Sequence, residues 1–563
     1  MDIFLACLDC GHQAPYSPTS NSCPRCNGTW REARYEYEKI GKTLQALLQG
    51  RGFDLWRYRE LLPVRNPHLV SSMGEGGTPL IQASNLGMML GCPNIFIKDE
   101  RQAPTSSFKD RQAAVGVAAL KEAGVTEVVI ASTGNVAISY SAYCARAGIK
   151  LWAFLTSLVP AEKMREVAIY GTQVIKVTAS YDQVKQVAAE FARQRGIYME
   201  RGARTIPSVE GMKTVAYEIS EQLTTTFGAQ RNYSNNGGGK SPGWQVPDWY
   251  VQSVSGGLGP LGVQKGFMEM REMGWIDRIP AMASIQAEGC APMVHAFREG
   301  KEVAEPVRNP RTHIATLATG DPGRTYTLLY QRMREGAGGV FESVTDEETY
   351  RTMHILAKME GISVEPAAAV AFAGVIKLVR AGKIKPNDTV VINCTGHTMP
   401  IETTILGEGW ARSVALPSHI TSQSTPEEGL LAALNRVTDD RFSSVAIVDD
   451  NEDARRLIRR ILQAQGNYKL FEASNGKDAI ELALCEVPDL IILDLMMPEF
   501  DGFAVLDALK ADPKTAHIPI IVVTAKELTK EEKTHLHGQI FSLMQKGEFM
   551  SDELMDDVNE LLK

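Results

Sequence analysis

The sequence predicts an α/β protein built on parallel sheets, with a small cysteine-rich segment at its N-terminus and a separate α/β domain at its C-terminus. Strand-like and helix-like segments alternate from about residue 40 to residue 409, which is typical of parallel βαβ units. A second, very regular alternation begins at residue 443, and four cysteines crowd into the first 26 residues. We therefore expect domains at residues 1–38, 39–415 and 443–563, joined by a linker at residues 416–442.

The elements expected in the long middle region follow from apolar runs and their periodicity. Strands are expected at residues 94–100, 125–132, 150–156, 172–178, 248–255 and 389–394. Helices are expected at residues 111–124, 139–148, 161–171, 181–196 and 261–270. Residues 231–244 are polar, glycine-rich and aperiodic, which predicts a flexible surface loop; a lid over an active site is the alternative.

The C-terminal region repeats a strand followed by a helix five times. The strand candidates are residues 445–450, 468–473, 489–495, 518–525 and 541–545. This regular repeat predicts a (βα)5 domain with a parallel sheet.

Composition and charge argue against two kinds of partner. The formal net charge of −8 argues against a nucleic-acid-binding surface spread over the chain. No uninterrupted apolar stretch approaches the length of a membrane span, and the N-terminus lacks the basic and then apolar pattern of a secretory signal. We therefore expect a cytoplasmic protein with no nucleic-acid or membrane partner, in which thiols stay reduced.

The N-terminal cysteines have the spacing of two zinc knuckles, Cys7-x2-Cys10 and Cys23-x2-Cys26. In a reducing compartment, four thiolates around one tetrahedral Zn²⁺ are favoured over two disulfides; paired free thiols are the alternative. Four protein ligands leave no open position on the metal. The sequence therefore predicts a zinc-ribbon-like segment that serves folding rather than catalysis.

One lysine, Lys109, lies between the strand at 94–100 and the helix at 111–124, in the motif PTSSFKDR. A second small-residue turn, ASTGN, follows at residues 131–135, where Ser132, Thr133 and Asn135 open a helix. The N–H groups and hydroxyls of such a turn can hold a substrate carboxylate. A lysine at a strand–helix junction that faces such a turn suits an enzyme that holds an aldehyde cofactor as a Schiff base. A solvated surface lysine is the alternative.

A glycine-rich turn, SGGLGP at residues 255–260, follows the strand at 248–255 and precedes a helix. Glycines allow the backbone to close around a phosphate at a helix N-terminus. The expected cofactor-phosphate residues are Gly256, Gly257, Leu258 and Gly259. As an isolated motif this turn is weak, but after the lysine motif it becomes a strong candidate.

These motifs resemble a fold-type II pyridoxal-phosphate enzyme, most closely the threonine synthase family. The resembling segments are residues 74–80, 97–111, 131–148, 210–214, 362–369 and 394–397. The resemblance implies that Lys109 binds pyridoxal phosphate and later shuttles protons at the substrate carbons. It gives Asn135 the cofactor's ring hydroxyl and places the hydroxyl of Thr395 against the pyridine nitrogen. A neutral partner there does not keep that nitrogen protonated, which favours elimination and replacement chemistry over transamination.

The segment before the EG-x-KT motif departs from the family and leaves the amino-acid substrate open. Threonine synthases usually carry a segment there that is rich in Asn and Ser and contains Pro and Arg, whereas this chain has ARTIPSVEG at residues 203–211. Phosphohomoserine, converted to threonine and phosphate, is the leading expectation. A β-replacement on phosphoserine or serine, or a Ser/Thr dehydratase reaction, stays open.

The C-terminal domain places carboxylates at the ends of its first and third strands. Asp449 and Asp450 end the first strand and Asp494 ends the third. The domain resembles a response-regulator receiver, and that resemblance implies a 2-1-3-4-5 sheet in which these strands lie side by side. Three carboxylates there would repel unless a divalent cation such as Mg²⁺ sat among them. With Thr524 and Lys546 holding the phosphoryl oxygens, Asp494 could act as the nucleophile towards a phosphoryl group.

The domain resembles a flavodoxin-like response-regulator receiver over its whole length. That resemblance adds the main-chain carbonyl of Met496 as a Mg²⁺ ligand and implies a histidine kinase or phosphotransfer protein as partner. Receivers commonly carry an aromatic residue three positions before the lysine and a proline after it. Here Leu543 and Gly547 occupy those positions, so the usual coupling between the strand-end threonine and the aromatic residue is not expected in its common form.

Together the motifs predict a threonine synthase-like lyase whose output a phosphorylatable receiver regulates. The family is often dimeric, so we also expect a homo-oligomer. A two-component signalling protein whose pyridoxal-phosphate fold senses an amino acid without turning it over is the alternative. The intact Lys109 and STGN turn argue against it, because a pure sensor does not need that lysine.

Overall fold

The structure, a computed structural model, describes most of the chain. The described residues are 3–132, 134–156, 159, 161–178, 181–232, 243–336, 338–397, 443–465, 468–498, 500–526, 528–546 and 551–562. They fall into two compact units, one within residues 1–84, 92–353 and 363–399, the other within residues 85–91, 354–362 and 400–563. The linker expected at 416–442 and most of the loop expected at 231–244 lie outside the described residues. Among the described helices, none has the length and apolar character that a membrane crossing requires.

The N-terminal segment forms a three-stranded antiparallel sheet in the order β2-β1-β3. Its strands are β1 (Phe4–Cys7), β2 (Gln13–Pro15) and β3 (Arg31–Arg34). Phe4 pairs with Pro15 on one side and with Arg34 on the other. Helix α1 (Tyr37–Leu48) follows. Its buried residues recur at helical spacing and form one apolar face: Tyr37, Ile40, Leu44 and Leu48.

A six-stranded sheet in the order β12-β11-β10-β13-β5-β4 forms one layer of the first unit. Its strands are β4 (Leu80–Gln82), β5 (Ile95–Asp99), β10 (Trp249–Ser253), β11 (Ala281–Ala287), β12 (Gly339–Val344) and β13 (Val390–Cys394). All neighbours are parallel except β4, which pairs antiparallel with β5. Helix α12 (Pro366–Arg380) packs on β10, β11 and β13 and buries eleven of its 15 residues. Its almost wholly apolar sequence suits this position between other elements.

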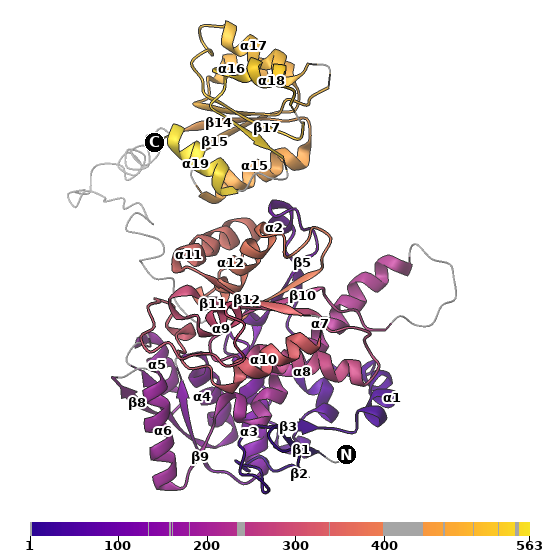
Figure 1. Ribbon diagram of the computed structural model, residues 1–563, viewed down its shortest axis with the longest axis vertical. Coiled ribbons are helices and arrows are strands. Elements are labelled where there is room, and N and C mark those ends of the chain that lie inside the picture. Colours follow the sequence, from indigo (N-terminus) through magenta and orange to yellow (C-terminus); the bar gives the residue numbers. More distant parts are fainter. Residues whose placement is uncertain are drawn as a thin grey trace, which may run out of the picture. The chain divides into compact units, whose positions relative to one another are not determined.

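A four-stranded parallel sheet in the order β8-β7-β6-β9 forms the other layer. Its strands are β6 (Glu127–Ser132), β7 (Lys150–Thr156), β8 (Gln173–Val177) and β9 (Tyr198–Met199). Successive strand residues point to opposite faces, so Val128 packs with helices α3 (Lys109–Glu122) and α4 (Asn135–Ala147) while Val129 packs with α6 (Tyr181–Arg195). Both parallel sheets confirm the predicted α/β class, and Figure 1 shows α4, α5 and α6 around the smaller sheet.

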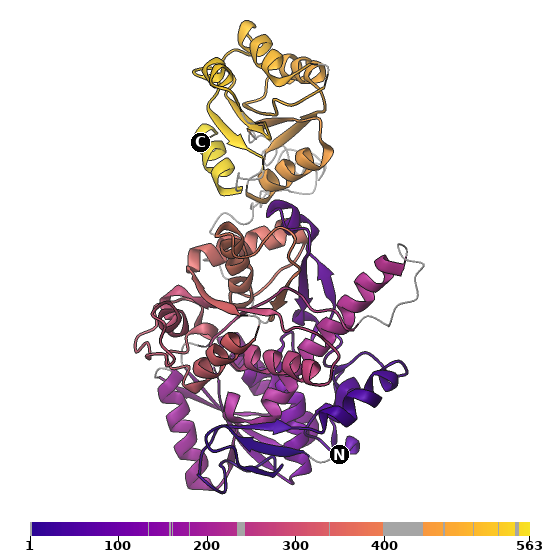
Figure 2. The same ribbon diagram turned by 45° about the vertical axis from the view of Figure 1, so that its right-hand side comes forward.

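Residues 85–91 and 354–362 belong to the second compact unit, although they lie in this part of the chain. The helices of this part of the chain connect the strands. They are α2 (Ser84–Met89), α3 (Lys109–Glu122), α4 (Asn135–Ala147), α5 (Ala161–Ile169), α6 (Tyr181–Arg195), α7 (Ile206–Asn232), α8 (Leu258–Glu272), α9 (Pro292–Arg298), α10 (Arg324–Glu335) and α11 (Asp346–Ile355). Short helical turns complete it: η1 (Leu55–Leu61), η2 (Pro67–Leu69), η3 (Glu100–Gln102), η4 (Gly202–Arg204), η5 (Glu288–Cys290), η6 (Ala315–Leu317) and the π-turn η7 (Leu356–Glu360). Helix α7 packs along both α3 and α8. In the turned view of Figure 2, α7 is the long magenta helix that extends towards the right.

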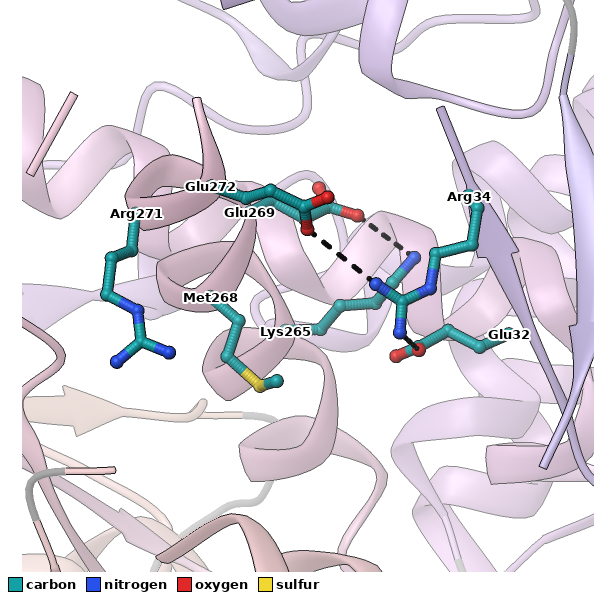
Figure 3. Close-up of a pocket in the computed structure, with 7 residues that line it drawn as sticks. All are labelled: Glu32, Arg34, Lys265, Met268, Glu269, Arg271 and Glu272. Atoms are coloured by element: carbon teal, nitrogen blue, oxygen red, sulfur yellow. Dashed lines mark ion pairs between the residues drawn. The ribbon is translucent and has the colours of Figure 1, made fainter. Parts of the chain in front are cut away.

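A buried network of charges anchors the N-terminal sheet to α7 and α8. Lys265 Nζ donates to the carbonyl oxygen of Ala33 at 2.8 Å and lies 3.0 Å from Glu269. Lys213 lies 2.9 Å from Glu269, and the Tyr37 hydroxyl donates to the same carboxylate at 2.7 Å. A small cavity of about 240 Å³ lies beside this network (Figure 3), lined by Glu32, Arg34, Lys265, Met268, Glu269, Arg271 and Glu272. Because both buried lysines have carboxylate partners, removing either carboxylate would leave an uncompensated buried charge at this contact.

The C-terminal domain is a five-stranded parallel sheet in the order β15-β14-β16-β17-β18. Its strands are β14 (Ser444–Val448), β15 (Lys469–Ala473), β16 (Leu490–Leu493), β17 (Ile520–Thr524) and β18 (Ser542–Gln545). Its helices are α15 (Glu452–Gln465), α16 (Gly476–Glu486), α17 (Gly502–Ala511), α18 (Lys530–Leu536) and α19 (Ser551–Leu561). One apolar cluster lies on each face of the sheet. This confirms the predicted (βα)5 fold with strand order 2-1-3-4-5.

Candidate functional site

The loop that carries Lys109 is held against the chain that leaves β13. The Phe108 amide donates to the Thr395 carbonyl at 3.0 Å, and the His397 amide donates to the Ser106 carbonyl at 2.9 Å. Ser107 pairs with Gly396 in an isolated antiparallel bridge. These bonds bring the predicted residues Lys109 and Thr395 into one part of the molecule, although 286 positions separate them in the chain.

The same loop is fixed from within by a buried carboxylate. Asp110 accepts hydrogen bonds from the Thr105 amide at 2.7 Å and from the Thr105 hydroxyl at 2.5 Å. Burial raises the pKa of Asp110 to about 6, although these hydrogen bonds act in the opposite direction. Ser106 adopts φ +56°, a conformation that a residue with a side chain rarely takes. The loop is therefore held tightly in one conformation directly before Lys109.

Lys109 begins α3 in an environment that favours its neutral amine. Its Nζ lies 4.3 Å from the centre of the Phe108 ring. Burial lowers the pKa of Lys109 to about 8, while the carboxylates of Glu200 and Glu365 act to raise it. A substantial fraction of the amine is therefore neutral near physiological pH and able to attack an aldehyde.

The STGN turn joins β6 to α4 at the carboxyl edge of the four-stranded sheet. Ser132 Oγ accepts hydrogen bonds from the Gly134 amide at 3.0 Å and from the Ala137 amide at 3.2 Å, so its oxygen caps the first turn of α4. Gly134 adopts φ +148°, which a residue with a side chain would rarely take. Thr133, the other expected hydroxyl, lies outside the described residues.

Asn135 is tied to two charged residues that lie far apart in the sequence. Its Nδ2 donates to Glu365 Oε1 at 2.7 Å, and its Oδ1 accepts from Lys163 Nζ at 2.7 Å. Lys163 Nζ also lies 3.3 Å from Glu365 Oε2. Lys163 is only 1% exposed and lies beside Gly134 in the STGN turn.

Sequence reasoning missed Lys163 and gave Glu365 no role. The available signal was a lysine at i and an apolar residue at i+4, Val167, on one face of α5, where both are buried. A charge on an otherwise apolar helix face points inward, and its burial here leaves a cation beside the STGN turn.

The glycine-rich turn lies at the N-terminus of α8, directly after β10. Gly257 adopts φ +86°, and a side chain at this position would clash with Thr325, because its Cβ would lie 2.7 Å from the Thr325 methyl carbon. At Gly259 a Cβ would lie 2.3 Å from Gln252 Nε2 and 2.9 Å from the Phe108 ring. At Gly256 the space is open, with Thr319 as the nearest neighbour at 3.9 Å. The turn thus approaches the Lys109 loop and leaves room for a phosphate at a helix N-terminus.

The receiver-like residues meet at the carboxyl edge of the C-terminal sheet. Carboxylate oxygens of Asp449, Asp450 and Asp494 lie within 4.8 Å of one another. Lys546 Nζ lies 2.6 Å from Asp449 Oδ2 and 2.6 Å from Asp494 Oδ2. Burial raises the pKa of Asp449, an effect that Lys546 opposes. Thr524 ends the neighbouring strand β17 and is 2% exposed.

Met496 follows Asp494 by two residues. Its amide donates to Asp494 Oδ1 at 3.1 Å, and its side chain is 53% exposed. The arrangement thus joins three carboxylates, one lysine and one hydroxyl at a sheet edge, which is a donor set that suits Mg²⁺ and a phosphoryl group.

The four N-terminal cysteines form one compact cluster. Cys7 Sγ lies 3.5 Å from Cys26 Sγ, and Cys10 Sγ lies 3.8 Å from Cys23 Sγ. Four sulfurs bound to zinc at about 2.3 Å in a tetrahedron lie about 3.8 Å apart. Desolvation raises the pKa of the Cys23 thiol, but amide hydrogen bonds outweigh this effect and lower it to about 7. At Cys26 the Gly28 amide acts to lower the thiol pKa, but the side chains of Cys10 and Cys7 outweigh it and raise that pKa to about 12. The sulfur spacing of the cluster, rather than thiol acidity, therefore matches a tetrahedral zinc site.

Two regions of the chain match known protein families. The pyridoxal-phosphate dependent enzyme family matches residues 71–396, and the response regulator receiver domain family matches residues 445–559. The chain belongs to the pyridoxal-phosphate-dependent enzymes. It carries a response-regulator receiver domain after its enzyme region, as the motifs predicted.

Among known proteins, several relatives of this chain are threonine synthases. The chain is 35% identical over 396 residues to threonine synthase of Methanocaldococcus jannaschii, covering 69% of this chain and 91% of the relative. It is 33% identical to threonine synthase of Methanosarcina acetivorans, covering 71% and 93%. A solved structure of diaminopropionate ammonia lyase from Escherichia coli matches at 16% identity and a TM-score of 0.49, covering 62% and 96%. The enzyme region is therefore a threonine synthase-like lyase that uses pyridoxal phosphate.

Proposed function

We propose that this enzyme converts phosphohomoserine to threonine and inorganic phosphate. The observation that carries this proposal is Lys163, a buried cation beside the STGN turn and bonded to Asn135. Lys163 Nζ already lies 3.3 Å from the carboxylate of Glu365, and an ammonium has three N–H donors, so it can also form a charge-assisted hydrogen bond to a substrate phosphate at the same turn. The threonine synthases among the relatives agree with this choice.

The residues present suit pyridoxal phosphate. When bound, the cofactor supplies an electron sink that makes protons on the substrate's carbon chain removable. The N-terminus of α8, with Gly256 to Gly259, would hold its phosphate through backbone N–H groups. Lys109 would hold its aldehyde carbon, Asn135 its ring hydroxyl, and the neutral hydroxyl of Thr395 would lie against its ring nitrogen.

Each residue then has a defined task in the reaction. The N–H groups at the start of α4 bind the substrate carboxylate, with Ser132 and Thr133 in the same turn. Lys109 takes a proton from a substrate carbon and returns one to another, which its lowered pKa permits near neutral pH. Lys163 holds the substrate phosphate until it leaves. The Cγ–O bond to phosphate breaks with its electron pair on the departing phosphate, Cγ gains a proton to become the methyl group, and water adds its oxygen to Cβ to give threonine.

Replacing Lys163 with methionine tests the phosphate assignment. Loss of a charge-assisted contact is expected to raise KM for phosphohomoserine by about tenfold to a hundredfold, since such a bond contributes about 1.5–3 kcal/mol. The absorbance of the bound cofactor should persist. The control is Lys150→Met. Lys150 is a surface residue at the start of β7, away from the STGN turn, and this variant should retain the wild-type KM. An unchanged KM in Lys163→Met would contradict the assignment.

A β-replacement or dehydratase reaction on serine-type substrates is the second candidate. It is favoured by the segment before EG-x-KT, where Ser208 donates its hydroxyl to Glu200 at 2.9 Å. A carboxylate in this position is unfavourable for a phosphate in direct contact with it. In such an enzyme, phosphoserine or serine would be consumed in preference to phosphohomoserine.

We further propose that Asp494 accepts a phosphoryl group and that this regulates the enzyme. Asp449, Asp450, Asp494 and the Met496 carbonyl would bind Mg²⁺, while Thr524 and Lys546 would bind the phosphoryl oxygens. The donor would be a histidine kinase or a phosphotransfer protein. Regulation is supported by the covalent union of the two domains, since phosphorylation adds close to two negative charges at a sheet edge.

We also propose that Cys7, Cys10, Cys23 and Cys26 bind one structural Zn²⁺ in a cytoplasmic protein. Replacing Cys10 with serine is expected to lower the melting temperature by several degrees, because metal binding and folding of this segment are coupled. Metal analysis should give one zinc per wild-type chain. The buried-thiol control Cys144→Ser should keep that zinc. A metal-free wild-type protein with four titratable thiols would contradict the proposal.

A further inference from the structure

Glu200 is a buried carboxylate to which neither motif nor family match assigns a task. It follows β9, which pairs in parallel with β6 through Val128–Tyr198 and Val129–Met199. The Glu200 amide donates to the Val129 carbonyl at 3.0 Å and extends this pairing. Because parallel strands end at the same edge, Glu200 leaves the sheet beside the STGN turn that follows β6.

Neutral donors hold the Glu200 carboxylate in place. Its Oε1 accepts from the Ser208 hydroxyl at 2.9 Å and from the Gly202 amide at 2.9 Å. The Tyr140 hydroxyl in turn lies 3.1 Å from Ser208 Oγ. Glu200 is only 6% exposed, so these bonds replace its water shell. Hydrogen bonds to a carboxylate stabilise its ionised form.

Glu200 lies close to the Lys109 loop, because Phe108 packs in one apolar cluster with Ala203 and Val209. These two residues directly follow Gly202 and Ser208, the donors that hold the Glu200 carboxylate. The charges of Glu200 and Lys109 therefore influence each other. Burial is the largest effect on each, and it raises the pKa of Glu200 and lowers that of Lys109. The charge of Glu200 acts to raise the pKa of Lys109 and is the largest effect that opposes burial there. In turn, the charge of Lys109 acts to lower the pKa of Glu200. Glu365 is the other carboxylate that acts on Lys109. The remaining titratable groups that interact with Glu200 are Tyr140, Tyr181, Tyr198 and Arg204.

We propose that Glu200 is the electrostatic partner of Lys109, a fixed anion that stabilises the ammonium formed when Lys109 takes a proton from the substrate. In this step the C–H bond breaks, the proton moves to Lys109 Nζ, and Glu200 stays ionised throughout. Glu200 thus acts through Lys109 and is a positioning residue rather than a group that touches substrate. The inference rests on the role of Lys109 given under the proposed function, but it does not depend on which substrate is used.

The physical reason is the cost of making a cation inside the protein. Lys109 alternates between a neutral amine and an ammonium during each turnover, and its surroundings disfavour the ammonium. A carboxylate that is already oriented can offset this cost without rearrangement. Glu365 is less available for the task, because it also bonds Asn135 and Lys163.

The test is a pH titration of the visible absorbance of the full-length holoenzyme in wild type and in Glu200→Gln. Removing a nearby buried anion should move the titration of the lysine-bound cofactor to lower pH by about one unit. The kcat should fall about tenfold or more while KM stays within about threefold. Glu200→Asp should restore part of both effects, since it keeps the charge.

Two further variants keep the result interpretable. Glu127→Gln makes the same chemical change at the opposite end of β6, where the carboxylate contacts Trp152, and should titrate like wild type. Ser208→Ala removes one of the donors to Glu200 and should give a smaller shift in the same direction; it serves if Glu200→Gln fails to fold. A titration unchanged in both Glu200→Gln and Ser208→Ala, or a loss confined to KM, would overturn the inference. A colourless wild-type protein would instead overturn the role of Lys109 itself.

Discussion

Replacing Lys109 with alanine is expected to remove the visible absorbance of the bound cofactor and to lower kcat by at least about a thousandfold. In the proposed mechanism Lys109 holds the cofactor covalently and moves protons at the substrate, so no second residue can take over both tasks. Its position depends on the Phe108–Thr395 backbone bond and on Asp110, which are independent of its side chain. The variant should therefore fold and still bind the cofactor's phosphate.

The role proposed for Lys109 also predicts a pH dependence of cofactor binding. In this proposal the neutral amine of Lys109 attacks the aldehyde of pyridoxal phosphate, and burial lowers the pKa of this lysine to about 8. In the cofactor-free protein, the rate at which pyridoxal phosphate restores the colour should therefore rise with pH until about pH 8 and then level off. Lys121→Ala, at the other end of α3, is the matched control and should stay yellow and active. A Lys109→Ala protein that is as yellow and as active as wild type would remove Lys109 from the mechanism.

Replacing Asp494 with asparagine is expected to abolish phosphoryl uptake from a small donor such as acetyl phosphate in the presence of Mg²⁺. The amide oxygen lacks the charge that attacks phosphorus, and the variant removes one of the three carboxylates that would hold the cation. Lys546 lies 2.6 Å from Asp494 and from Asp449, so Asp449 remains as its partner and the domain should stay folded.

Comparison of phosphorylated and unphosphorylated wild-type enzyme then tests regulation. Phosphorylation should change kcat or KM at least about twofold in wild type and leave Asp494→Asn unaffected. Asp507→Asn, on α17 and paired with His535, is the control and should accept phosphate normally. Full phosphorylation of Asp494 without any change in substrate kinetics or assembly state would contradict the regulatory proposal.

The sequence was sufficient to predict the parts of the fold in which local pattern and tertiary packing agree. The five strands of the C-terminal domain are short apolar runs that end in polar residues, and all five lie where the pattern predicted them. The parallel sheets of the enzyme region followed in the same way from alternating runs. Strands β4, β9, β11 and β12 were not predicted. Strands β4 and β9 are only three and two residues long, and the runs around β11 and β12 lack clear boundaries.

The residues of the candidate site also fall into two groups, those in local sequence motifs and those that reach the site only through tertiary contacts. Lys109, Asn135 and the turn at Gly256–Gly259 lie in motifs at strand–helix junctions, where a parallel fold directs residues to one edge. Lys163, Glu200 and Glu365 reach the site through contacts that span up to 230 positions, as between Asn135 and Glu365. No local pattern encodes such contacts. Ser132 also shows that a hydroxyl in a recognisable turn can have a second task, since its oxygen caps α4.

The measurement that tests the account most directly is product formation by the purified, pyridoxal-phosphate-loaded wild-type protein. It should be supplied in parallel with phosphohomoserine, phosphoserine and serine, and both inorganic phosphate and the amino-acid product should be quantified. We expect threonine and phosphate in equal amounts from phosphohomoserine, and turnover of the two serine compounds at least about a hundredfold slower. Preferential consumption of phosphoserine or serine, or no turnover of any of the three by a yellow protein, would contradict the proposed function.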